Sequence, residues 1–142
     1  MKYLCLVYLD EKRLEEVPDA ECVAFDAGLR ADGRCLASEA LQSVTTATTV
    51  RVRNGKIAII DGPFAETKEQ LAGFYMIEAR DLNEAIQIAS KIPPARVGSI
   101  EVRPVRPIRE TVAAEQAKRE GHVSGIAAGT PLLPKTREPD RL

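Results

Sequence analysis

Residues 57–78 read IAIIDGPFAETKEQLAGFYMIE, and this stretch decides the fold because it joins two apolar runs through a tight polar turn. The turn opens with Asp61-Gly62-Pro63, residue types that reverse the chain because glycine accepts unusual backbone angles and proline fixes its own. Charged side chains of both signs follow at once. The stretch therefore predicts two strands joined by a charged loop, and that loop is the first place to look for a site.

The second apolar run, residues 71–79, is apolar on both of its faces. Successive side chains of a strand point to opposite faces of the sheet. One face carries Leu71, Gly73, Tyr75 and Ile77, and the other carries Ala72, Phe74 and Met76. Residues 2–9 at the start of the chain show the same two-sided pattern. Both segments are expected to be strands that are covered on each side.

A β-hairpin is predicted immediately before the loop, where the chain reads TATTVRVRNGKIAII. Asn54-Gly55 stands between alternating β-forming residues, and both residue types tolerate the positive φ angles of a two-residue hairpin turn. Val50 and Val52 alternate with Arg51 and Arg53. One face of the hairpin is therefore expected to be buried and the other solvated.

Two helices are predicted in the remainder of residues 1–105. The first begins at Pro18-Asp19, buries Cys22, Phe25 and Leu29, and ends at Asp32-Gly33. The second is capped by Asp81 with Glu84 three residues later, and it stops at Pro93-Pro94. Its inward stripe is expected to comprise Leu82, Ala85, Ile86 and Ala89. Further extended segments are expected over residues 34–41 and 98–103.

The predicted order is strand, helix, strand, hairpin, strand, helix, strand. It is typical of a ferredoxin-like α+β domain with an antiparallel sheet and both helices on one face. The other face would expose a large apolar patch, and a second copy of the sheet is its simplest cover. We therefore expect a homodimer with sheet packed on sheet.

Residues 106–142 differ in composition, because they are rich in proline, glycine and charge. One helix is expected over residues 111–120, ended by Gly121 and followed by the only histidine, His122, in a solvated position. The segment is too poor in large apolar residues for a core of its own. The predicted organisation is a domain over residues 1–105 and a C-terminal extension over 106–142.

Composition narrows the classes of partner. Twenty Lys and Arg residues against 21 Asp and Glu give a net charge of −1, which argues against nucleic-acid binding because no broad positive field results. The sequence predicts neither a signal peptide nor a membrane span. Cys5, Cys22 and Cys35 form no CxxC pair, which argues against a disulfide framework or a zinc site and favours the cytoplasm. Cys22 is expected to be a buried core residue.

The motif Asp61-Gly62-Pro63-Phe64 followed by AETKEQLAGFYMIE resembles the DGPF-type branch of the YCII-related family. The segments TATTVRVRNGK, DLNEAIQIASKIP and GSIEVRPV agree with that branch in order and spacing, so the resemblance covers about residues 1 to 105. It implies a dimeric α/β barrel, in which ferredoxin-like sheets pair face to face. DGPF-type proteins are often encoded beside, or fused to, extracytoplasmic-function sigma factors, which implies a sigma factor as a partner.

Related YCII proteins carry a His/Asp pair proposed as a catalytic dyad. Their histidine lies in the first helix and their aspartate after the second. This chain has no histidine in its first helix, and Ile92-Pro93-Pro94-Ala95 stands where the Asp-Pro pattern is expected. The dyad is therefore not transferred to this chain.

The candidate site residues cluster on the loop. Asp61 and Glu66 are the catalytic candidates, and the candidate ligand-binding residues are Asp61, Phe64, Glu66, Lys68 and Tyr75. Each also has an ordinary structural role: an Asp before Gly-Pro accepts backbone hydrogen bonds, and charged loops are commonly only solvated. A divalent cation held by Asp61, Glu66 and Glu69 is a weaker alternative. Tyr3, Tyr8 and Tyr75 could instead line a cavity or belong to the core.

Two functions remain open at this point. The first is a module that binds a small polar molecule or a protein partner and has a regulatory role. The second is a cofactorless enzyme of the lyase or isomerase kind, with Asp61 or Glu66 as base and a tyrosine or Lys68 as electrophilic donor. No cofactor is expected, because the sequence has no phosphate-binding glycine loop, nucleophile elbow or metal cluster. The missing histidine favours the binding module.

Overall fold

The computed structural model describes residues 1–122, and the chain divides into the units Met1–Val105 and Arg106–Leu142. The strands are β1 (Lys2–Leu9), β2 (Cys35–Ala40), β3 (Thr48–Arg53), β4 (Lys56–Asp61), β5 (Gln70–Glu78) and β6 (Ser99–Pro104). The α-helices are α1 (Asp19–Ala31), α2 (Leu82–Ala89) and α3 (Ile108–His122). Short 3-10 turns are η1 (Glu11–Glu16), η2 (Val44–Thr46) and η3 (Pro93–Arg96).

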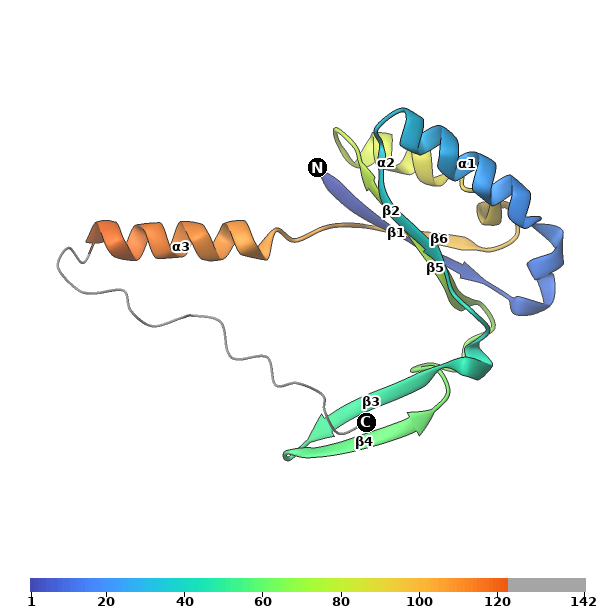
Figure 1. The fold of residues 1–142 in the computed structure, drawn as a ribbon, viewed down its shortest axis with the longest axis horizontal. Helices are drawn as coiled ribbons and strands as arrows, with labels where there is room; N and C mark the ends of the chain where they lie inside the picture. The colour runs from blue at the N-terminus through green and yellow to red at the C-terminus, as the bar shows by residue number, and fades with distance from the viewer. Residues whose placement is uncertain (123–142) are drawn as a thin grey trace. The chain divides into compact units, whose positions relative to one another are not determined.

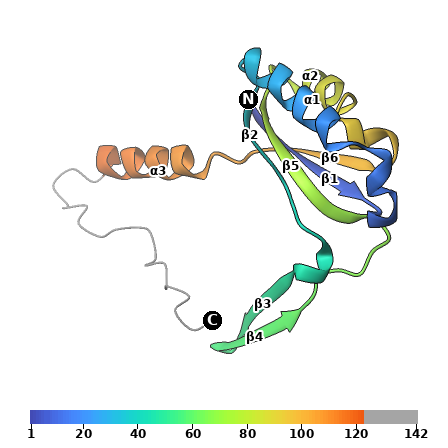
Figure 2. The same cartoon turned by 45° about the vertical axis from the view of Figure 1, so that its right-hand side comes forward.

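The larger sheet is antiparallel and has the strand order β2-β5-β1-β6. Helices α1 and α2 lie on one of its faces (Figures 1 and 2). This is the ferredoxin-like arrangement, with the β3–β4 hairpin inserted between the edge strand β2 and the inner strand β5. The α+β fold and its helices on one face are confirmed.

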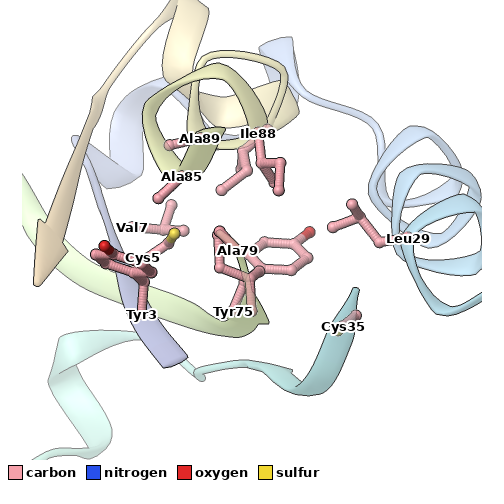
Figure 3. Packing of buried hydrophobic residues seen from close by; sticks show 12 residues of the cluster. Tyr3, Cys5, Val7, Leu29, Cys35, Tyr75, Ala79, Ala85, Ile88 and Ala89 are labelled. Carbon is pink, nitrogen blue, oxygen red and sulfur yellow. The ribbon is translucent and has the colours of Figure 1, made fainter. Parts of the chain in front are cut away.

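The core lies between the helices and one face of β1 and β5. Tyr3, Cys5, Val7 and Leu9 of β1 are buried on this face, while the intervening side chains are partly exposed on the other. In Figure 3 the Tyr75 ring points from β5 toward Leu29 of α1, and both residues belong to one buried cluster with Ala85 and Ala89 of α2. Phe25 of α1 contacts Tyr75 edge-on, with ring centroids 5.7 Å apart.

The face of the sheet without helices, here called the open face, is apolar along its centre. Leu4 pairs with Met76, and Leu6 pairs with Phe74, so large side chains of β1 and β5 stand side by side. Leu6 and Phe74 lie in a row of paired residues that runs across the four strands. Glu101 of β6 pairs with Leu6 and Glu39 of β2 pairs with Phe74, so each end of this row carries a carboxylate. Residues 2–9 and 71–78 are strands, as predicted, and the cover expected for their open face stays a prediction.

The predicted helix caps are present, with one difference in detail. The Asp81 carboxylate accepts the Glu84 backbone N–H at 2.9 Å, as expected. The Glu84 carboxylate, however, accepts the backbone N–H of Arg80 at 3.1 Å and not that of Asp81. Helix α1 begins at Asp19 after Pro18 and ends at Ala31, before Gly33, whose φ is 70°.

The predicted inward stripe of α2 is correct for Ala85 and Ala89 and wrong for Leu82 and Ile86. Leu82 and Ile86 are half-exposed, and the buried residues of the helix are Ala85, Ile88 and Ala89. The buried set continues to Ile92 just beyond the helix, at spacings of three, four and seven from Ala85. Two overlapping stripes compete in this sequence, and the one that extends to Ile92 faces the sheet.

The hairpin has the predicted turn but not the predicted burial. Asn54 and Gly55 have φ angles of 52° and 73°, as the two-residue turn requires. Val50 and Val52, which were expected to be buried, are 47% and 54% exposed. The reason is that, within residues 1–122, β3 and β4 pair with each other and not with the larger sheet.

The last strand and the following helix begin close to the predicted positions. Ile100 and Val102 of β6 pack against the core, as expected. Helix α3 begins earlier than predicted, directly after Pro107, and it includes Gly121, which was expected to end it. The expectations for residues 123–142 and for the His122 side chain lie outside the described residues. No helix of residues 1–122 is long and apolar enough to cross a membrane.

We predict that Gly98→Ala destabilises the domain. A Cβ atom at Gly98 would collide with the backbone carbonyl oxygen of Tyr8 and would lie 3.3 Å from the Leu9 Cα, so β1 or β6 must shift. Overpacking of this kind typically costs about 1–3 kcal/mol, measurable by urea unfolding.

The matched control is Gly28→Ala in α1. Among the described residues nothing lies within 4 Å of its added Cβ. Alanine in a helix should leave stability unchanged or raise it by about 0.5–1 kcal/mol. Equal effects of the two substitutions would contradict the close approach of β1 to Gly98.

Candidate functional site

The loop after β4 begins with a turn that is fixed by hydrogen bonds. Gly62 has a φ of 118°, a backbone conformation that residues with a side chain rarely adopt. Its N–H donates to the Ala47 carbonyl at 2.8 Å, and its carbonyl accepts from the Thr49 hydroxyl at 2.8 Å. The Asp61-Gly62-Pro63 turn therefore holds the end of β4 to the start of β3.

The candidate site residues of this loop point into solvent. Asp61, Glu66 and Lys68 are exposed, and Phe64 is 80% exposed, with the Arg51 guanidinium 5.9 Å from its ring centroid. The Glu69 carboxylate accepts the Ser99 hydroxyl at 2.7 Å, which ties the loop to β6. Within residues 1–122 no group of His, Cys, Asp and Glu side chains is arranged to hold a metal ion. The part of these loop residues in binding stays a prediction.

A pocket of about 390 Å³ lies between α1 and the larger sheet, and it is called the α1–sheet pocket below. Of the candidate residues, Tyr75 lines it and the loop residues do not. Most of its lining is apolar, with a few polar groups among the side chains. The lining residues are Val7, Leu9, Leu14, Val17, Asp19, Cys22, Val23, Asp26, Ser38, Glu39, Ala40, Ala72, Gly73, Phe74, Tyr75 and Pro94.

Asp26 is the best-anchored polar group of this pocket. Its Oδ1 accepts the Ser38 hydroxyl at 2.6 Å and the Cys35 thiol at 3.4 Å, and its Oδ2 accepts Arg30 Nε at 2.8 Å. The Ser38 hydroxyl also accepts from Arg30 Nη2 at 3.2 Å. The helix α1 and the edge strand β2 together fix the carboxylate in one orientation.

The hydrogen bonds around Asp26 favour its charged form. The Ser38 hydroxyl is the largest cause, with Arg30 and Cys35 adding to it, and together they hold the pKa of Asp26 below its ordinary value of 3.8 against the opposing effect of burial. The carboxylate is therefore ionised at neutral pH. A group in this state accepts hydrogen bonds or pairs with a cation, and it is a weak base.

The pKa values of the neighbouring thiols and phenol are raised, whereas that of Asp26 is lowered. Burial raises the pKa of Tyr75 to about 12 and also raises the pKa of Cys22 above its ordinary value of 9.0. Burial is likewise the first cause that raises the pKa of Cys35, followed by its hydrogen bond to Asp26. These groups remain protonated at neutral pH, so Cys22 and Cys35 are poor nucleophiles.

A second, more polar groove lies between α1 and α2. Its volume is about 530 Å³, and its rim carries Arg34, Arg80 and Lys91. The Glu84 carboxylate lies 2.8 Å from Arg80 Nε and 3.7 Å from Arg34 Nη1, so it occupies the two arginines. Two of the three cations of this groove already pair with Glu84, whereas the α1–sheet pocket combines an apolar lining with one fixed carboxylate, so it is the stronger candidate.

Comparison with known proteins places the chain in a family. The model of the YCII-related domain matches residues 1–109. The chain belongs to the YCII-related family. A curated relative, the uncharacterized protein R00369 of Rhizobium meliloti (strain 1021), is 48% identical over 67 residues, which are 46% of this chain and 54% of that protein. The chain thus matches about half the length of this curated relative.

A solved structure also resembles this YCII-related chain. It is 5-chloro-2-hydroxyhydroquinone dehydrochlorinase from Burkholderia phenoliruptrix AC1100 in complex with 2,5-dihydroxybenzoquinone. The TM-score is 0.46 and the sequence identity 13%, over 75% of this chain and 94% of that one.

Sequence reasoning missed the main group of the pocket in this YCII-related chain. Asp26 and Arg30 were visible as an acid and a base four residues apart on a predicted helix, which is a common surface pair. The decisive partner is Ser38, which lies twelve residues from Asp26 and reaches it only because β2 runs beside β5 under α1. No local pattern could indicate that contact.

We predict that Ser38→Ala raises the pKa of Asp26 toward 3.8, because it removes the largest cause of the lowering. An NMR titration of the Asp26 carboxyl carbon measures this directly. Since the native pKa lies below the ordinary value, ionised Asp26 stabilises the fold above about pH 4, and this stabilisation is lost as the pH falls through the native pKa. Ser38→Ala should therefore lose less stability on acidification than the wild type.

The control is Ser90→Ala. The Ser90 hydroxyl donates to the Gln87 carbonyl at 2.7 Å at the exposed end of α2, remote from Asp26 in the chain. It should leave the Asp26 titration unchanged. An unaltered Asp26 pKa in Ser38→Ala would contradict the assigned hydrogen bond.

Proposed function

We propose that the α1–sheet pocket binds a small, largely apolar molecule that donates a hydrogen bond to Asp26. The observation that carries the proposal is a fixed, ionised carboxylate in a mostly apolar pocket of about 390 Å³. Ligand pockets commonly have volumes of roughly 300–1,000 Å³ and a few fixed polar groups that orient the ligand. The combination supports recognition of one polar group on an apolar body.

Asp26 retains capacity for a ligand. A carboxylate has about four acceptor positions, and donors from Ser38, Cys35 and Arg30 occupy three of them. The Asp26 side chain is also 26% exposed, so it can be reached from outside the protein. A hydroxyl or amine of the ligand would complete the set.

Binding is better supported than catalysis. A general acid or base works best when its pKa lies near the operating pH. In the pocket, hydrogen bonds lower the pKa of Asp26, and burial raises the pKa of Cys22 and of Tyr75. Each of these pKa values is therefore moved further from neutral pH. The lyase or isomerase alternative relies on Asp61 or Glu66, whose side chains are exposed and lie outside the α1–sheet pocket.

We also propose that the protein is a homodimer in which two open faces pack together. Leu4, Leu6, Phe74 and Met76 form an apolar centre on that face, and they are only partly covered within one chain. Stable interfaces bury about 1,200–2,000 Å² in total, and two β-sheets pack well face to face. The family's expected barrel supports the same arrangement.

The binding proposal predicts that Val23→Trp closes the pocket. Val23 lines the α1–sheet pocket and is 67% exposed, so an indole there can cover the mouth without entering the core. Monocyclic phenols and amines screened by NMR should shift amides of α1 and β2. For any compound that binds, Val23→Trp should raise the Kd by about tenfold or more, which is about 1.4 kcal/mol.

Ala27→Trp provides the matched control. Ala27 is exposed on the same helix, one turn further along, and does not line the pocket. Its Kd should stay within about twofold of the wild type, which is a difference below 1 kcal/mol. Shifts centred on residues 61–69, with unchanged affinity in Val23→Trp, would contradict the proposal and favour the loop.

A further inference from the structure

The β3–β4 hairpin has one face made of branched hydrocarbon. Val50 pairs with Ile59 and Val52 pairs with Ile57, so these side chains stand together on one side of the two-stranded ribbon. All four are about half-exposed. We call this surface the arm face.

The opposite face of the hairpin has a different character. Arg51 pairs with Ala58 and Arg53 pairs with Lys56, so cations dominate its centre and tip. The hairpin is therefore amphipathic, with hydrocarbon on one side and positive charge on the other. A two-stranded hairpin alone is marginally stable in water, and exposed apolar patches of this kind mark contact surfaces.

Continuity with the open face favours a second copy of this chain as the occupant. The hairpin is joined to β2 through residues 41–47 and to β5 through residues 62–69. The strand β5 carries Phe74 and Met76 of the open face. The hairpin therefore extends from strands that belong to the open face itself. A second copy that covers this face comes close to the hairpin.

Apolar complementarity supports the same occupant. The centre of the open face carries Leu6 and Phe74, and the arm face carries branched hydrocarbon side chains of β3 and β4. A copy of this chain thus offers an apolar surface to a hairpin whose arm face is itself apolar, and the cations of the opposite face point away from that contact. In a symmetric dimer each such contact would occur twice.

We infer that the hairpin is a dimerisation arm whose arm face packs against the second copy of this chain, extending the contact between the two open faces. The inference rests on the dimer proposed above, and it adds a specific surface to it. It also explains why a β-rich, apolar hairpin is retained outside the larger sheet.

The test compares Ile59→Lys with Ile60→Lys. These neighbours are the same residue type, and they are 52% and 44% exposed, but Ile59 belongs to the arm face and Ile60 to the opposite face. Both substitutions add the same charge at a position that is already wet, so circular dichroism and thermal unfolding of the core should change little. Sedimentation equilibrium should show a dimer Kd at least about tenfold higher for Ile59→Lys and within about threefold for Ile60→Lys.

The outcomes separate the arm from the dimer and from the pocket. If the wild type is a dimer and the two variants have the same dimer Kd, the arm is overturned and the dimer proposal stands. A wild type that is monomeric at all concentrations overturns the arm and the dimer together, while binding in the α1–sheet pocket is unaffected. In a mixed sample of labelled and unlabelled chains, nuclear Overhauser contacts from the Ile59 methyls to the other copy support the arm. Contacts to their own chain alone overturn it, because the hairpin would then fold back.

Discussion

The pairing of β1 with β5 is the constraint on which the rest of the structure depends. Both strands are apolar on both faces, and their antiparallel register places Cys5 beside Tyr75 on one face and Leu6 beside Phe74 on the other. Burying one large apolar side chain contributes about 1.5–3 kcal/mol, so neither face can remain in water without a substantial loss. Helices α1 and α2 cover the first face. The second face is the reason for proposing a dimer.

The same sheet also creates the candidate site. Ser38 on β2 pairs with Tyr75 on β5, and the Ser38 hydroxyl reaches up to Asp26 on α1. Three elements that are distant in sequence thus meet at one end of the core and leave an apolar pocket beside a fixed carboxylate. The pocket is a consequence of how α1 lies across the sheet, and its one strongly anchored charge comes from the same packing.

Local patterns predicted the elements well. Short apolar runs identified β1 and β5, Asn54-Gly55 identified the hairpin turn, and Asp81 identified the start of α2, because each of these is decided by neighbours within a few residues. The burial of particular faces was harder to predict. Ile86 and Ile88 are equally apolar, and only the position of the sheet determines that Ile88 faces it.

One larger error concerns the burial of the hairpin, and the prediction for the loop beside it stays open. The hairpin was expected to have a buried face, and the loop beside it was expected to hold the site, because both carry the clearest sequence signals. In the described residues Val50 and Val52 are exposed, and the best-anchored polar group of the α1–sheet pocket is Asp26, which lies outside the loop. Alternation indicates which side chains share a face but not what covers that face, and a carboxylate on a helix gives no sign of the strand that will hold it.

The central claim is that the open face is covered by a second copy of the chain, and solvent accessibility in solution tests it most directly. A soluble gadolinium chelate relaxes methyl groups that solvent can reach. The measurement is made at a protein concentration where the chain is expected to be dimeric. If the claim is right, the chelate will relax the Leu4 and Leu6 methyls as weakly as those of the fully buried Ile77. Relaxation of Leu4 and Leu6 as strong as that of the half-exposed Leu82 on α2 would contradict it.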